Sequence, residues 1–181
     1  AKGPKPKASA KVTNAAGQAV TELDCEVVYR KASEIFTDAF GHSAPILDFD
    51  IPTLEWPGEP HPDVPEINSS FRFYAPVLAK ALFGLKTGKI SWLMGETGCG
   101  KSEFWAQVAA RIGFPYIRMN MDSHLTRGDL IGTSRLVPGE SGQPVMTFVE
   151  GIIPRALQMP CIMLIDEFDL GDPEIMPVIQ P

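Results

Sequence analysis

"GETGCGKS", residues 95–102, is the stretch of sequence that decides the fold. Gly95 and Gly100, followed by Lys101 and Ser102, fit the pattern G-x-x-x-x-G-K-[ST]. Glycines at this spacing let the backbone curl so that its N–H groups point inward at phosphate oxygens. The lysine of the pattern reaches the β- and γ-phosphates of a nucleotide, and the serine hydroxyl ligates Mg²⁺. The stretch therefore predicts a phosphate-binding loop, called the P-loop below.

The sequence on either side of the P-loop supports this interpretation. The short apolar run "KISWLM" (89–94) predicts a strand that leads into the loop. In "SEFWAQVAARIG" (102–113), apolar residues recur at helical spacing and Gly113 is a natural stop. Such a helix adds its positive N-terminal end to the loop. We expect the nucleotide, ATP, to contact Gly95, Glu96, Thr97, Gly98, Cys99, Gly100, Lys101, Ser102 and Glu103.

A second informative stretch is "CIMLIDEFD" (161–169), in which an unbroken apolar run ends in two acids. The run predicts a buried strand. An acid at the carboxyl end of such a strand lies where the phosphates bind in α/β folds. We expect Asp166 to hold Mg²⁺ together with Ser102, and Glu167 to orient and deprotonate the attacking water. The Asp-Glu pair favours an ATPase, with Glu167 and Lys101 as its catalytic residues, over a phosphotransferase.

The remaining elements predict an α/β fold with a parallel sheet flanked by helices. Helices are expected over 75–88 and 152–159, a strand over 114–121, a hairpin over 135–151 ahead of the Asp-Glu strand, and a helix from Asp172. Residues 25–40 predict a short strand and a helix. We expect a flexible basic tail (1–20), an N-terminal segment (21–76) and an ATPase core (77–181), incomplete at its C-terminus. Residues 45–76, with seven prolines, are expected to form a solvated acidic arm or an arm that docks on an adjacent subunit.

Composition limits the class of protein. The 181-residue chain has a formal net charge of −6 and a pI of about 5.1, which argues against broad nucleic-acid binding. It has no run of 18 apolar residues and no recognisable signal peptide, so neither a membrane span nor secretion is expected. Its three cysteines have no metal-like spacing. Reduced thiols in the cytoplasm are the simplest interpretation.

A few polar residues allow two interpretations. Cys99 is either a tolerated small residue of the P-loop or a redox-sensitive thiol. Asp122, His124 and Asp129 suggest either a metal site or, as we favour, side chains that shape the turn after the second strand. Three arginines face either a neighbouring subunit or solvent, and the sequence does not choose between these: Arg118, Arg127 and Arg135.

These motifs together resemble the AAA+ ATPases, in particular the MoxR-like branch and, most closely, the cobaltochelatase subunits of the CobS type. The resemblance covers residues 63–180, and its most specific stretches are "DSHLTRGDLIG" (122–132) and "DEFDLGDPEIM" (166–176). It implies a homo-oligomeric ring, most often a hexamer, that works with a von Willebrand-type partner subunit while a large subunit inserts cobalt into a corrin. It also implies a sensor residue, an arginine finger and a helical lid beyond Pro181.

The sequence thus leaves three hypotheses about function. The first is a CobS/MoxR-like ring ATPase that uses Mg-ATP to remodel a partner complex, with cobalt chelation as one such process. The second is a MoxR-like chaperone unconnected to cobalt. The third is a module that binds a nucleotide or a partner without hydrolysis.

Overall fold

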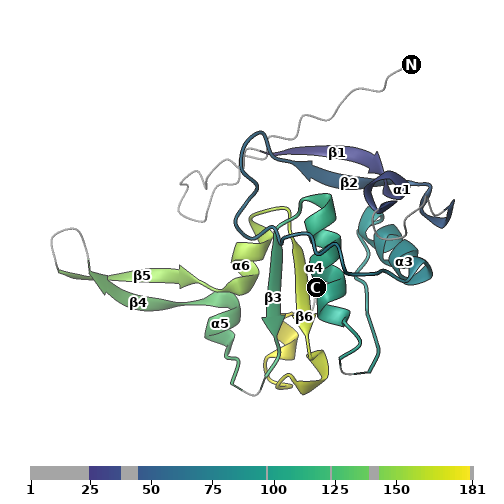
Figure 1. Cartoon of the computed structure of the whole chain (residues 1–181). Coiled ribbons are helices and arrows are strands. Elements are labelled where there is room, and N and C mark those ends of the chain that lie inside the picture. Colours follow the sequence, from purple (N-terminus) through teal and green to yellow (C-terminus); the bar gives the residue numbers. More distant parts are fainter. Residues whose placement is uncertain (1–24, 38–44, 97, 123, 139–142, 180–181) are drawn as a thin grey trace. The chain divides into compact units, whose positions relative to one another are not determined.

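The structure, a computed structural model, describes residues 25–37, 45–96, 98–122, 124–138 and 143–179 (Figure 1). The described residues form two compact units, which divide between Tyr116 and Ile117. The expected basic tail (1–20) lies outside the described residues. In the described part of the chain, no helix is both long enough and apolar enough to span a membrane.

The first unit begins with a two-stranded antiparallel sheet. Strand β1 (Glu26–Lys31) pairs with β2 (Asp50–Glu55) in a register that runs from Glu26 opposite Glu55 to Lys31 opposite Asp50. Helix α1 (Ala32–Ile35) and a 3-10 turn (Pro45–Leu47) lie between these strands in the sequence. The strand and short helix expected over residues 25–40 are therefore present in the part that is described.

The solvated arm expected over residues 45–76 is wrong for its first part. Leu47, Ile51 and Leu54 are buried in the core of the first unit, and β2 carries a full ladder with β1. The expectation fails because the prolines and acids dominate the composition, whereas a few apolar residues, Leu47 in the 3-10 turn and Ile51 and Leu54 in β2, decide the burial of this part. Pro52 fits within β2 because β2 has only one strand partner in the two-stranded sheet.

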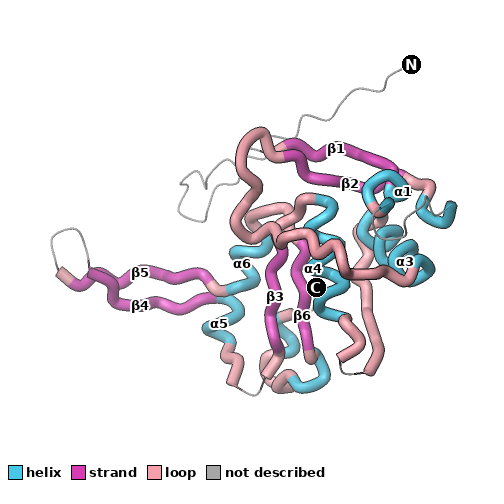
Figure 2. Tube along the Cα trace, in the orientation of Figure 1, coloured by secondary structure: helices cyan, strands magenta, loops and turns pink. Residues whose placement is uncertain are grey.

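Two helices complete the first unit (Figure 2). Helix α3 (Ala75–Lys86) buries Leu78, Ala79, Ala81 and Leu82, as its helical spacing predicts. Helix α4 (Lys101–Ile112) follows the P-loop and ends at Gly113, which has the left-handed backbone expected of a helix stop. Both helices were expected from the sequence.

The strand expected over residues 89–94 does not form in the structure. Residues 89–94 belong to neither a helix nor a strand, and their alternating apolar side chains are exposed: Ile90, Trp92 and Met94 are 91%, 64% and 82% exposed. A strand needs a hydrogen-bonded neighbour, and an apolar pattern predicts only which side chains such a neighbour would cover.

The second unit contains the parallel pair of strands. Strand β3 (Tyr116–Asn120), which starts at the last residue of the first unit, pairs with β6 (Ile162–Asp166), and both run in the same direction (Figure 1). Helices α5 (Arg127–Ile131) and α6 (Ile152–Leu157) belong to the same unit. The hydrophobic core of this unit contains Met119, Met121, Leu130 and Ile175. The expected α/β architecture is therefore confirmed.

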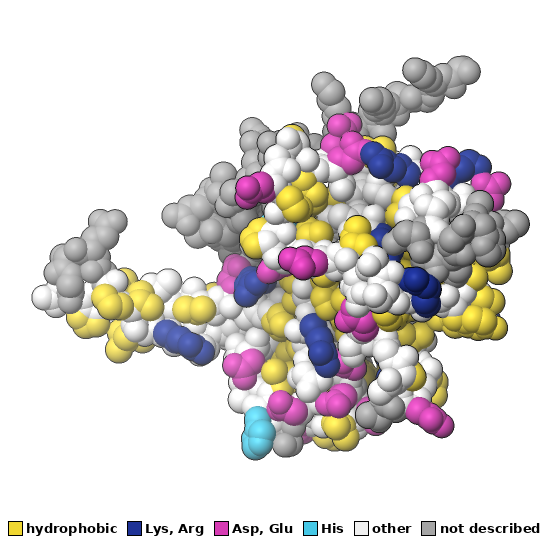
Figure 3. Space-filling view, viewed as in Figure 1, with side chains coloured by type: hydrophobic (Ala, Val, Ile, Leu, Met, Phe, Trp, Pro, Cys, Tyr) yellow, Lys and Arg dark blue, Asp and Glu magenta, His cyan; other side chains and the backbone are white. Residues whose placement is uncertain are grey.

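The hairpin expected before β6 is present. Strands β4 (Gly132–Pro138) and β5 (Pro144–Glu150) pair antiparallel, and the hairpin extends away from α5 and α6 (Figure 1). Leu136 lies opposite Met146, and Phe148 is next along the same face of β5. All three side chains are exposed, and Figure 3 shows hydrophobic side chains along this hairpin.

The chain beyond β6 differs from the expectation of a helix from Asp172. It forms two 3-10 turns, Phe168–Leu170 and Met176–Val178. Asp172 does accept a hydrogen bond from the backbone N–H of Glu174 at 2.9 Å, as a helix N-cap would. Pro177 follows too soon for α-helical hydrogen bonds to continue, because it lacks an N–H group.

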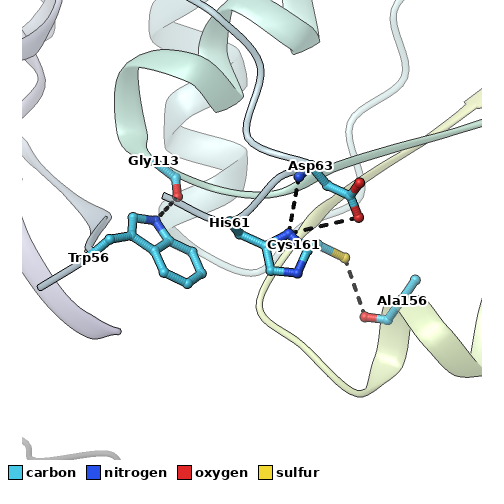
Figure 4. Close-up of polar contacts among 6 residues, drawn as sticks. All are labelled: Trp56, His61, Asp63, Gly113, Ala156 and Cys161. Atoms are coloured by element: carbon cyan, nitrogen blue, oxygen red, sulfur yellow. Dashed lines mark hydrogen bonds and ion pairs between the residues drawn. The ribbon is translucent and has the colours of Figure 1, made fainter. Parts of the chain in front are cut away.

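The end of α4 is fixed by a close approach of two backbones. Trp56 donates its indole N–H to the carbonyl of Gly113 at 2.8 Å (Figure 4). Gly113 has φ +73°, and a Cβ atom added there would lie 2.4 Å from the carbonyl oxygen of Leu54. Only glycine fits this position without a shift of the backbone.

We expect Gly113→Ala to lower the free energy of unfolding by about 2 kcal/mol or more, because the left-handed backbone and the contact with Leu54 both oppose a side chain. Gly58→Ala is the matched control, since a Cβ there meets nothing within 4 Å. The control should shift stability by less than about 1 kcal/mol. Urea unfolding of the intact protein measures both, and equal midpoints for the two variants would contradict this account.

Candidate functional site

The P-loop has the backbone that its glycines predict. Gly98 and Gly100 have φ angles of 82° and 85°, in the left-handed region that favours glycine. Gly100 is also the N-cap of α4, so the N–H groups of the first helical turn begin directly after the loop. These groups and the helix dipole attract anions. Thr97, which the sequence places in the loop, lies outside the described residues.

Lys101 turns back across the P-loop. Its ammonium group donates hydrogen bonds to the backbone carbonyls of Gly95 and Glu96, both at 2.8 Å, and lies 3.9 Å from the Cys99 sulfur. The positive charge that the motif predicts is therefore held at the loop itself. Carbonyl dipoles satisfy only part of that charge, so an anionic ligand can replace them.

Ser102 follows in the first turn of α4, where its backbone carbonyl accepts a hydrogen bond from the Tyr116 hydroxyl at 3.0 Å. Glu96, Cys99 and Glu103 are exposed at the same loop and helix start. The described residues of the predicted nucleotide-binding set thus lie in the P-loop and in the first turn of α4.

A buried amide ties α4 to the chain before the P-loop. Gln107 is 3% exposed and uses both ends of its side chain. Its oxygen accepts from the Asn68 backbone N–H at 2.8 Å and from Arg111 at 2.7 Å. Its nitrogen donates to the Glu66 carbonyl at 3.2 Å and to the Glu103 carboxylate at 3.0 Å. The sequence analysis missed Gln107, because a single polar residue on an amphipathic helix gives no sign that it is buried.

The two acids of the second motif lie at the end of β6. Asp166 is the last residue of the strand, and its side chain is 15% exposed. One of its carboxylate oxygens, Oδ2, lies 2.8 Å from Nη2 of Arg118 on β3. The other, Oδ1, accepts the backbone N–H of Glu167 at 3.1 Å. The sequence analysis did not decide whether Arg118 faces solvent or a neighbouring subunit. In the structure, Arg118 forms an ion pair with Asp166 of its own unit.

Glu167 has an unusual backbone. With φ 53° and ψ 39°, it is the only non-glycine with a positive φ among the described residues. Such a conformation costs roughly 1–3 kcal/mol and tends to persist at functional sites. The turn ends the strand abruptly and leaves the Glu167 side chain exposed. A solvent-facing carboxylate beside a largely covered one is an arrangement that can serve a water and a metal ion separately.

The donor atoms fit the metal that the motifs imply. A serine hydroxyl from Ser102 and a carboxylate from Asp166 are hard oxygen ligands of the kind that Mg²⁺ prefers. The P-loop and the two acids belong to different compact units. The geometry of the P-loop and the geometry of the two acids are therefore defined separately.

The turn after β3 contains no metal cluster in the described part of the chain, where no group of three or more His, Cys, Asp or Glu side chains gathers. Asp122 instead accepts the His124 backbone N–H at 2.7 Å. Thr126 and Asp129 form a reciprocal capping box at the start of α5. Hydrogen bonds from the side chain and then the backbone of Thr126 hold the pKa of Asp129 below its usual value. The interpretation of these residues as turn-shaping is confirmed.

Comparison with known proteins gives one family and several relatives. A family model described as "AAA domain (dynein-related subfamily)" matches residues 91–181, half of the chain. The aerobic cobaltochelatase subunit CobS of Sinorhizobium sp is 37% identical over 117 residues, which cover 65% of this chain and 35% of that protein. An uncharacterized protein of Staphylococcus haemolyticus is 31% identical over 101 residues, covering 56% of this chain and 38% of its own length. The chain thus spans little more than a third of these curated relatives.

Proposed function

The chain belongs to the AAA domain family, dynein-related subfamily, as an AAA+ ATPase of the CobS/MoxR-like type with a P-loop NTPase fold, and we propose that it hydrolyses Mg-ATP to remodel a partner complex. One observation carries this proposal. A P-loop with its lysine turned across the loop occurs in the same chain as an Asp-Glu pair at the end of a strand.

The P-loop binds the triphosphate in this proposal. Backbone N–H groups from Gly95 to Gly100, with Glu96, Thr97, Gly98 and Cys99 between them, and those of the first turn of α4 point at phosphate oxygens. Lys101 leaves the two carbonyls that hold it and binds the β- and γ-phosphates. Glu103, in the first turn of α4, is hydrogen-bonded to Gln107 and so stays beside the loop.

Ser102 and Asp166 would hold the metal ion in this proposal. When bound, Mg²⁺ neutralises charge on the phosphates and on the leaving group. The serine supplies a hydroxyl and the aspartate a carboxylate, the latter acting mainly through water because Mg²⁺ dehydrates reluctantly.

Glu167 acts on the attacking water. Its carboxylate accepts a proton from the water as the water oxygen bonds to the γ-phosphorus. The bond from that phosphorus to the β-γ bridging oxygen then breaks, which yields ADP and phosphate. The Glu167 side chain is exposed, whereas the Asp166 carboxylate is engaged by Arg118. This separation of roles supports a hydrolase over a non-hydrolysing module.

The proposed assembly and partner rest on the resemblance to CobS-type subunits. CobS, which is 37% identical over 117 residues, is a subunit of an aerobic cobaltochelatase, and this supports metal chelation as the process that the ATPase drives. We propose that the intact protein forms a homo-oligomeric ring of six and acts with a von Willebrand-type partner subunit. In such a ring the nucleotide lies at a subunit boundary, where an arginine from the next subunit completes the site.

Lys101→Ala should weaken nucleotide binding by about tenfold or more, because the β- and γ-phosphates lose their main counter-charge. Lys80→Ala is the matched control, since it removes a lysine from the exposed side of α3. Calorimetric titration of the intact protein with a non-hydrolysable ATP analogue, which carries both phosphates, measures both. Wild-type affinity in Lys101→Ala would rule out the P-loop as the nucleotide site.

Glu167→Gln should bind Mg-ATP normally but hydrolyse it at a rate lower by at least about 10²-fold. The amide keeps the size and polarity of the side chain and loses the base. Glu174→Gln makes the same change at an exposed acid a few residues on, and its turnover should equal wild type. Phosphate release under saturating Mg-ATP is the measurement. Unchanged turnover in Glu167→Gln would assign the water-activating role to another residue.

ATP should increase the mass of the intact protein in solution, because a ligand shared by two subunits stabilises their contact. Light scattering with and without ATP tests this, with Lys101→Ala as the variant in which ATP should have no such effect. A monomer under both conditions with full ATPase activity would leave a self-contained P-loop enzyme and no ring.

A further inference from the structure

The ion pair between Arg118 and Asp166 points to a role that the nucleotide motifs do not assign. Arg118 lies on β3 and Asp166 on β6, and the Met121 N–H donates to the Asp166 carbonyl at 2.9 Å. This backbone bond fixes the register of the two strands, so that Arg118 reaches Asp166 with 2.8 Å between Nη2 and Oδ2.

We propose that Arg118 is the exchangeable counter-ion of Asp166, so that binding of Mg²⁺ with the nucleotide breaks this ion pair. The inference rests on the proposed role of Asp166 as a metal ligand. Arg118 would then be a positioning residue, which holds the carboxylate when the metal is absent and sets how strongly Mg²⁺ assists nucleotide binding.

The burial of the two partners supports an exchange. The Asp166 side chain is 15% exposed, and a carboxylate so covered needs a counter-charge in place of lost water. Arg118 is 52% exposed, and its long side chain can move its guanidinium into solvent at little cost. The carboxylate is the fixed partner because the Glu167 N–H also binds its Oδ1 atom.

Charge makes simultaneous occupation unfavourable. A guanidinium within hydrogen-bond distance of Asp166 would lie a few ångströms from a divalent cation on the same carboxylate, and like charges at that range repel. Mg²⁺ therefore has to displace Arg118. The free energy of the lost ion pair then reduces the stabilisation that the metal gives to nucleotide binding.

The measurable quantity is the dissociation constant of ADP in EDTA divided by that in saturating Mg²⁺, here called the magnesium ratio. Any general attraction of Arg118 for phosphate affects both constants and cancels in the ratio. Calorimetry of the intact protein with ADP gives both values. Arg118→Met should raise the magnesium ratio by about two- to five-fold, the range expected for a half-exposed ion pair.

Two matched variants sharpen this test. Arg118→Lys keeps the charge and should leave the magnesium ratio closer to wild type than Arg118→Met does. Arg135→Met removes an exposed arginine from β4 of the same unit and should not change it. Thermal unfolding in EDTA checks that the variants fold, and Arg118→Gln replaces Arg118→Met if the latter does not.

A lower or unchanged magnesium ratio in Arg118→Met would overturn the exchange, because a purely structural or orienting role predicts a loss or no effect. Asp166→Asn separates this failure from that of the proposed function. If Asp166→Asn removes the benefit of Mg²⁺ while Arg118→Met changes nothing, the metal-ligand role stands and the exchange alone is wrong. If Asp166→Asn keeps the wild-type ratio, Asp166 is not the metal ligand and both fail.

Discussion

The buried amide of Gln107 is the constraint on which the first unit depends. It binds two backbone groups of the segment before the P-loop, at Glu66 and Asn68, and two side chains of its own helix, Glu103 and Arg111. A buried amide with all these bonds made is stable, whereas the loss of any one leaves a polar group without water. The network therefore ties α4, whose N-terminus follows the P-loop, to the segment before the loop.

The charged groups of the candidate site share one feature. Lys101 is held by two loop carbonyls, and Asp166 is held by Arg118 and by the Glu167 N–H. Each charge thus has a partner within its own unit before any ligand arrives. In the proposed mechanism, nucleotide and metal exchange these internal partners for stronger ones, so binding affinity would report a difference between two sets of contacts.

Sequence alone predicted the elements whose signals are local. The glycine spacing of the P-loop, the helical period of α4, the β-prone arms that became β4 and β5, and the apolar run of β6 each depend on neighbours in the chain. Strand β2 was missed and residues 89–94 were assigned to a strand that does not form, because strand pairing depends on distant segments. The roles of Arg118 and Gln107 were missed for the same reason, since their partners lie far away in the sequence.

The backbone of Glu167 connects the fold to the proposed chemistry. A strand that continued past Asp166 in extended conformation would place the next side chain on the opposite face of the sheet. The left-handed turn at Glu167 instead ends the strand, and its N–H binds the Asp166 carboxylate. The same turn therefore orients one acid through a hydrogen bond and exposes the other to solvent. A metal ligand and a general base need different surroundings, and in the proposed mechanism this one strained residue separates the two neighbouring carboxylates into those two roles.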